Sequence, residues 1–256
     1  MNYTPSLAKN AALAVGLALG SATAQANLLL TVNVHNLANP TGVAVGGLHV
    51  GFHRGVFDGF NAGTEAGTAI VPVAELGSGS AWLPALAAAD PTATRGTVGG
   101  VVLPGQSSSA TFVVNPLQNP FFSYAAMVVP SNDHFIGNDS PTALRLFNAA
   151  GELAITNLTL KASQIWDAGS ETFDPAAAAF VGNAALRTAE QGVVTTDFAE
   201  FAKYDGLPTA AGYSFTSGLR ADTDFYRIDF SATQIPEPGA MTLALAGLLL
   251  GGAATW

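Results

Sequence analysis

The stretch Leu28–His35, LLLTVNVH, alternates apolar and polar side chains from Leu30 onward. A period of two residues places successive side chains on opposite faces of the chain, which is typical of a strand with one buried face. Other short apolar runs, each bounded by Gly, Pro, Ser or Asn, follow along the chain. They predict further strands at Gly47–Phe52, Val98–Leu103, Ala110–Val114, Phe121–Val129, Leu153–Lys161 and Phe225–Phe230.

Roughly seven or more short strands separated by turn signals favour an antiparallel sandwich or barrel. We therefore expect a mainly β fold, an antiparallel β-sandwich of one domain over residues 27–233, with short helices in the connections. Helices are predicted at Gly67–Leu76 and at Pro141–Ala149, where Asp139 and Ser140 supply a cap and Pro141 suits the first turn.

The composition excludes several classes of protein. The 256 residues include 9 Lys and Arg against 18 Asp and Glu, a formal net charge of −9, and no Cys. So few basic residues cannot neutralise a nucleic-acid backbone, and without Cys there are no disulfides, thiol nucleophiles or Cys-ligated metals. Since 49% of the residues are hydrophobic and only 11% are charged, the chain is expected to fold rather than to be disordered.

Residues 1–26 have the pattern of a secretory signal peptide. A short basic start precedes the apolar run Ala11–Ala22, and Ala24 and Ala26 form a small-residue cleavage site. The mature chain would begin after Ala26, which predicts export from the cytoplasm. The alternative is that this segment forms a buried N-terminal helix.

Residues 234–256 have the pattern of a sorting tail. Pro236, Glu237 and Pro238 precede Gly239–Trp256, which carries no charged side chain and is close to the length that spans a bilayer as a helix. The arrangement resembles the PEP-CTERM signal of Gram-negative bacteria, which an exosortase-type membrane protease recognises. The resemblance implies a cell-surface, outer-membrane-associated or extracellular protein linked to biofilm, with membrane contact only through this tail. The Arg cluster that usually ends the signal is not present, and a plain membrane anchor is the alternative.

Motifs of the common enzyme classes are missing. There is no G-x-S-x-G nucleophile motif, no H-E-x-x-H zinc motif and no glycine-rich phosphate-binding motif. His49 and His53 are four residues apart but lie in a predicted strand, and His35 and His134 have no partner nearby in sequence. We interpret the four histidines as structural or surface residues, and no catalytic residue is predicted.

Two polar loops, Pro130–Asp139 and Ile165–Glu171, collect acidic residues, and each follows a predicted strand. Calcium takes about six to eight oxygen ligands, and loops at one end of a sandwich can bring such oxygens together from distant positions. Asp133 and Asp167 are therefore candidate calcium ligands. The alternative is that both residues cap turns through Asx hydrogen bonds.

Four stretches resemble, in order, the F-spondin-type (Spondin_N) domain in its bacterial form. They are Gly51–His53 with Val73–Gly77 (VAELG), Met127–Gly137 (MVVPSNDHFIG), Asn138–Pro141 (NDSP) with Leu144, and Trp166–Glu171 (WDAGSE). The resemblance covers about Leu28–Ala232. It implies a C2-like β-sandwich that holds a structural calcium ion (Ca²⁺) at one end.

Carried over residue by residue, the resemblance implies Asp133 and Asp167 as preferred ligands, Glu75 as a further one, and Glu171 and Asp139 as weaker ones. The alternative for Glu75 is a structural role at the end of a helix. This chain departs from the family at His134, where an aromatic residue, often Trp, is common.

Because animal relatives serve matrix attachment, the expected function is that of an exported, non-enzymatic, calcium-binding surface or extracellular-matrix module, adhesive or biofilm-associated. Its expected partners are the exosortase-type sorting machinery and an extracellular polysaccharide or surface protein. The alternative is a secreted polysaccharide-acting hydrolase that uses Asp133 and Asp167 as paired carboxylates. Such enzymes hold the two groups about 5–10 Å apart across a sugar cleft.

Overall fold

The computed structural model describes residues 27–235 of the chain. These residues form two antiparallel sheets with a few short helices, which confirms the expected β-sandwich. The predicted signal peptide with Ala24 and Ala26, and the predicted sorting motif Pro236, Glu237 and Pro238, lie outside the described residues.

The strands and helices are as follows. The first sheet contains β1 (Leu28–Asn36), β5 (Ser107–Val114), β8 (Asn157–Lys161) and β11 (Asp224–Gln234). The second contains β2 (Ala44–Val45), β3 (Leu48–His53), β4 (Thr94–Val98), β6 (Phe121–Val129), β7 (His134–Gly137), β9 (Trp166–Asp167) and β10 (Thr195–Thr196). Between them lie α1 (Val71–Leu76), α2 (Trp82–Ala89) and the 3₁₀ segments η1 (Ala162–Gln164), η2 (Ala184–Leu186) and η3 (Ala199–Tyr204).

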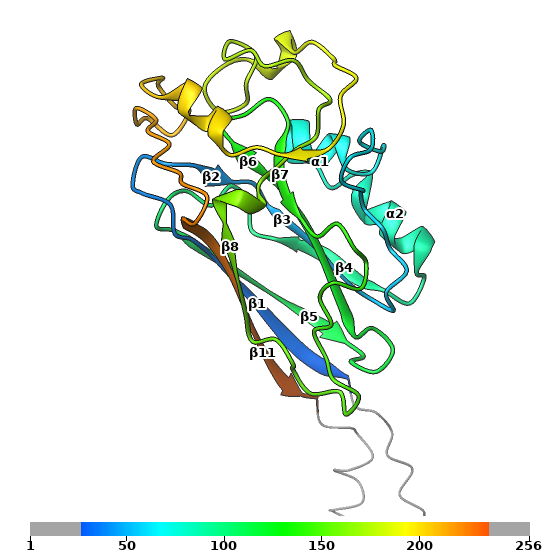
Figure 1. The fold of residues 1–256 in the computed structure, drawn as a ribbon. Helices are drawn as coiled ribbons and strands as arrows, with labels where there is room; N and C mark the ends of the chain where they lie inside the picture. Colours follow the sequence, from blue (N-terminus) through cyan, green and yellow to red (C-terminus); the bar gives the residue numbers. More distant parts are fainter. Residues whose placement is uncertain (1–26, 236–256) are drawn as a thin grey trace, which may run out of the picture.

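The strand order is β5-β1-β11-β8 in the first sheet and β10-β9-β7-β6-β3-β4 in the second, where β2 also pairs with β6. The main core fills the space between the two sheets (Figure 1). In β1 the alternation has the predicted effect, because Leu30, Val32 and Val34 are fully buried while Thr31 and Asn33 are only partly so. Val32 pairs with Phe230 of β11, so both side chains enter the same core.

Helices α1 and α2 cover the outer face of the second sheet and bury a second, smaller core (Figure 1). Strands β3 and β6 are therefore buried on both faces rather than on alternate residues. Leu86 of α2 packs so closely over β3 that a side chain at Gly51 would collide with it. Glycine at this position is required for the helix to reach the sheet.

The structure corrects two helix predictions. Helix α1 covers only Val71–Leu76, the second half of the predicted Gly67–Leu76, and α2 was not predicted. No helix forms at Pro141–Ala149, where the N–H groups of Leu146 and Phe147 both donate to the carbonyl of Pro120. These side chains are buried in the main core, so tertiary contacts prevailed over the helix-start signal.

The predicted bounds of β6 match those in the structure. The predicted bounds of β1, β3 and β5 lie near the observed ones. The predicted strand Val98–Leu103 is wrong, because β4 ends at Val98 and Gly99 turns the chain with φ +65°. Strand β8 begins only at Asn157. The polar loop Pro130–Asp139 contains β7, and the loop Ile165–Glu171 contains β9, so both candidate loops join the sheet.

The two ends of the described chain lie together. The N–H of Ile235 donates to the carbonyl of Asn27 at 3.2 Å, next to the paired ends of β1 and β11. The loops that follow β6 and β9 lie at the opposite end of the sandwich, which we call the loop end (Figure 1). Within residues 27–235, no helix is both long enough and apolar enough to span a membrane.

His53 is a buried structural histidine. Its Nδ1 accepts from the N–H of Gly55 at 3.0 Å, so the neutral ring donates from Nε2 to the Ser123 hydroxyl at 2.9 Å. Burial lowers its pKa from 6.5 to about 4, against the attraction of Asp90. The unfolded chain therefore binds a proton that the folded chain excludes between these two pH values.

We expect the free energy of unfolding to fall as the pH is lowered from about 6.5 toward 4, by an amount on the order of 3 kcal/mol from this residue. Urea unfolding at several pH values would measure the fall in the wild type and in His53→Gln, whose polar amide does not titrate. The fall should be smaller in His53→Gln and unchanged in His35→Gln. Equal falls in all three proteins would contradict this role of His53.

Candidate metal centre

Strands β7 and β9 and the residue that follows β10 bring His134, Asp167 and Asp197 together at the edge of the second sheet. His134 of β7 pairs directly with Asp167 of β9, so their side chains share one face of the sheet. Strand β10 pairs with the other side of β9, with Thr195 opposite Asp167. Asp197 comes two residues after Thr195, which returns its side chain to the same face.

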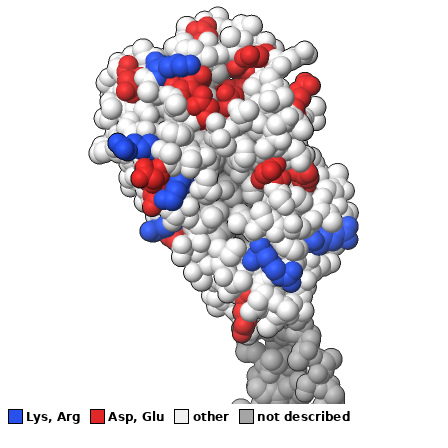
Figure 2. Space-filling view, in the orientation of Figure 1, with Lys and Arg blue, Asp and Glu red and all other residues white. Residues whose placement is uncertain are grey.

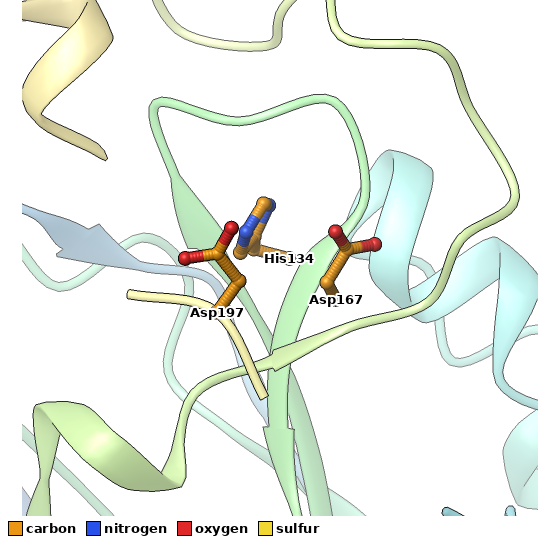
Figure 3. A group of neighbouring side chains, drawn as sticks. All are labelled: His134, Asp167 and Asp197. Carbon is orange, nitrogen blue, oxygen red and sulfur yellow. The ribbon is translucent and has the colours of Figure 1, made fainter. Parts of the chain in front are cut away.

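Figure 3 shows His134 between Asp197 and Asp167, with one carboxylate on either side of the imidazole ring. One nitrogen of His134 and one carboxylate oxygen each of Asp167 and Asp197 lie within 4.8 Å of one another. The His134 side chain has no exposed surface and its ring packs edge-on against Phe201, with the ring centres 5.0 Å apart. Within residues 27–235, neither ring nitrogen of His134 has a partner in good hydrogen-bonding geometry, although the backbone of Asp197 is close enough to the ring to act to raise its pKa.

Both aspartates of this group also hold local backbone. The Oδ1 atom of Asp167 accepts from the N–H of Gly169 at 2.7 Å, which is an Asx-type turn. The Oδ1 atom of Asp197 accepts from the N–H groups of Ala199 at 2.7 Å and Glu200 at 3.2 Å, at the start of η3. These bonds orient each carboxylate through one oxygen and leave the other, Oδ2, for a further partner.

Burial lowers the pKa of His134, although the Asp167 and Asp197 carboxylates act to raise it. A neutral imidazole carries a lone pair on one nitrogen and a proton on the other, and the neutral form is the one that binds a metal ion.

Asp133 lies beside this group but makes different contacts. It is 2% exposed, and its Oδ2 accepts from the N–H of Ser170 at 2.6 Å, the Ser170 hydroxyl at 3.2 Å and the N–H of Glu171 at 2.9 Å. Burial, reinforced by the nearby Asp167 carboxylate, raises the pKa of Asp133 to about 6 despite these bonds. Asp133 thus ties the loop after β6 to the loop after β9, and it is not an Asx cap.

Glu75 and Glu171 meet at the same end of the molecule, with Arg187 between them. The Arg187 Nε lies 3.2 Å from Oε1 of Glu171 and 3.4 Å from Oε2 of Glu75. Burial and the neighbouring Glu75 raise the pKa of Glu171 to about 8, against the attraction of Arg187. The three side chains line a small pocket of about 150 Å³.

The loop end is therefore rich in carboxylates, and Figure 2 shows acidic side chains gathered over it. The structure brings the predicted ligands Asp133 and Asp167 close enough to repel each other. Glu171 and Glu75 form a second pair, and the charge of Asp133 also acts to raise the pKa of Glu171. Asp139 makes a different contact: its carboxylate accepts a hydrogen bond from the N–H of Ala62.

Sequence reasoning missed His134 and Asp197 as possible metal ligands. His134 has no partner nearby in sequence, and Asp197 lies 63 residues further along the chain. Only the strand order β10-β9-β7 places them in one row. Among the other histidines, His49 bonds to Thr97 and to the carbonyl of Gly77, which fits the structural role expected for it.

Comparison with known proteins gives no assignment for this chain: no protein-family model matches it, and no curated protein matches it in sequence.

Proposed function

We propose that this chain is an exported, non-enzymatic surface or extracellular-matrix module that holds a structural calcium ion at the loop end of its β-sandwich. In this proposal it is an F-spondin-type domain protein with a PEP-CTERM-type tail, and it serves adhesion or a biofilm. The observation that carries the proposal is that Asp133, Asp167, Glu75 and Glu171 come together at one end of the fold from three separate segments.

The charge balance at this end supports a bound cation. The pKa of Asp133 and that of Glu171 are both raised, to about 6 and about 8, mainly because burial disfavours a charged carboxylate and further because neighbouring carboxylates repel it. A divalent cation would relieve this repulsion. Arg187 supplies one positive charge there, so calcium would have to compete with its guanidinium for Glu75 and Glu171.

The burial of Asp133 favours an ion over the hydrolase alternative. A glycosidase needs both carboxyl groups at a cleft that admits a sugar ring. Asp133 is 2% exposed and its Oδ2 already accepts three hydrogen bonds. Its carboxyl group is therefore better arranged to order two loops than to reach a polysaccharide.

The position of the two chain ends fits surface display. Asn27 and Ile235 leave the sandwich together, at the end opposite the acidic loops (Figure 1). A module held by its C-terminal tail would then present the loop end away from the membrane. Its partner would be an extracellular polysaccharide or a surface protein, and an anionic partner would approach more easily through the bound calcium.

Calcium at 1 mM is expected to raise the melting temperature of the full-length chain by about 1–5 °C. Extracellular sites bind with a Kd of about 10⁻⁴–10⁻³ M, so the ion contributes roughly 0.4–1.4 kcal/mol, and each kcal/mol is worth about 2–4 °C at this chain length. Thermal unfolding followed by circular dichroism, with calcium and then with EDTA, measures the shift.

The shift should disappear in Asp133→Asn and Glu75→Gln and persist in Asp222→Asn, which changes an exposed acid elsewhere. A wild type whose melting temperature does not respond to calcium would exclude a calcium site. Fractionation of cells that express the chain tests export separately: the mature protein should be found at the surface or outside the cell, not in the cytoplasm.

A further inference from the structure

We propose that His134, Asp167 and Asp197 form a second metal site, which takes a divalent transition-metal ion such as Zn²⁺. The proposal goes beyond the calcium site: the two sites share Asp167, but this one adds a nitrogen ligand and does not depend on Asp133, Glu75 or Glu171. Imidazole suits zinc and related transition metals, whereas calcium takes oxygen ligands. A set of one imidazole and two carboxylates therefore selects a different cation.

The unpartnered ring of His134 is the observation that points to a ligand. The ring has no exposed surface, and among the described residues neither nitrogen has a partner in good hydrogen-bonding geometry. A buried polar group that is left unsatisfied destabilises the fold. Since the ring faces two carboxylates (Figure 3), a cation bound between the three residues would satisfy it.

The three ligand atoms are near enough for one ion to draw them together. Zinc lies about 2.0–2.2 Å from nitrogen and oxygen ligands, so the ligand atoms of a tetrahedral site are about 3.4 Å apart. The three ligand atoms here lie within 4.8 Å of one another, and rotations of the two Asp side chains would bring them closer. Three protein ligands leave a fourth position for water.

The backbone holds these ligands in place without the metal. His134 and Asp167 are fixed by direct strand pairing, and Asp197 is fixed by the bonds it accepts from Ala199 and Glu200. The packing of His134 against Phe201 restrains the ring. A site held in this way loses little conformational freedom when it binds an ion.

The test is titration of the untagged full-length chain with Zn²⁺ by isothermal titration calorimetry, with the ring nitrogens of His134 followed by NMR. The wild type should bind one equivalent, and the His134 nitrogen resonance should shift. His134→Gln and Asp197→Asn should each weaken binding by about tenfold or more. Asp197→Asn keeps the carbonyl oxygen that caps η3, so it remains informative if His134→Gln does not fold.

His35→Gln is the matched control, because His35 also faces a carboxylate, Asp229 at 3.0 Å, but is partly exposed on the first sheet. It should leave zinc binding unchanged. Glu75→Gln should weaken calcium binding and leave zinc binding intact, so the two proposals can fail separately. Failure of the wild type to bind zinc, or binding that His134→Gln and Asp197→Asn do not weaken, would overturn the second site.

Discussion

Replacing Phe122 with Ala is expected to lower the free energy of unfolding by about 3–5 kcal/mol. Phe122 in β6 is 1% exposed, and its ring lies 5.5 Å from that of Phe52, 5.7 Å from that of Tyr124 and 5.0 Å from that of Phe230. Phe230 belongs to the opposite sheet. The substitution would therefore leave a cavity at the place where the two sheets meet.

Urea unfolding followed by fluorescence measures this loss, and Val113→Ala serves as the control. Val113 lies in β5 and is 50% exposed, so its truncation should change the free energy of unfolding by about 0.5 kcal/mol or less. Phe122→Leu should have an intermediate effect because it leaves a smaller cavity. A loss below about 1 kcal/mol for Phe122→Ala would be inconsistent with a well-packed contact between the sheets.

Replacing Asp133 with Ala is expected to destabilise the chain by about 2–4 kcal/mol even in EDTA. The substitution removes the acceptor of three hydrogen bonds, from the N–H and hydroxyl of Ser170 and the N–H of Glu171. Glu171 is buried, so its N–H group would have no water to replace the carboxylate. The loops after β6 and β9 would then lose three of the hydrogen bonds that connect them.

Asp133→Asn separates this structural role from metal binding. The side-chain carbonyl of Asn can accept the same three hydrogen bonds, so in EDTA this variant should lose much less stability than Asp133→Ala. It lacks the negative charge, so calcium should no longer stabilise it. Equal losses for the two variants in EDTA would mean that the hydrogen bonds to Ser170 and Glu171 are not what makes Asp133 important for stability.

The pattern of apolar residues along the chain predicted the strands best where that pattern is strong. The alternation in Leu28–His35 and the continuous apolar run Phe121–Val129 both became strands close to their predicted bounds. The pattern failed at Pro141–Ala149, where a helix start signal is present but Leu146 and Phe147 are needed in the core and bond to Pro120. Short segments follow their tertiary contacts when these conflict with propensity.

For the candidate site, the sequence by itself determined that acids follow the strands at one end of a sandwich, and Asp133 and Asp167 do lie near each other there. Only the tertiary structure decided that Arg187 pairs with Glu75 and Glu171, and that His134 faces Asp167 and Asp197. The physical reason is that hydrophobic periodicity is a local property, whereas strand order and register depend on contacts between distant segments. Residues such as His134 and Asp197 meet through that register alone.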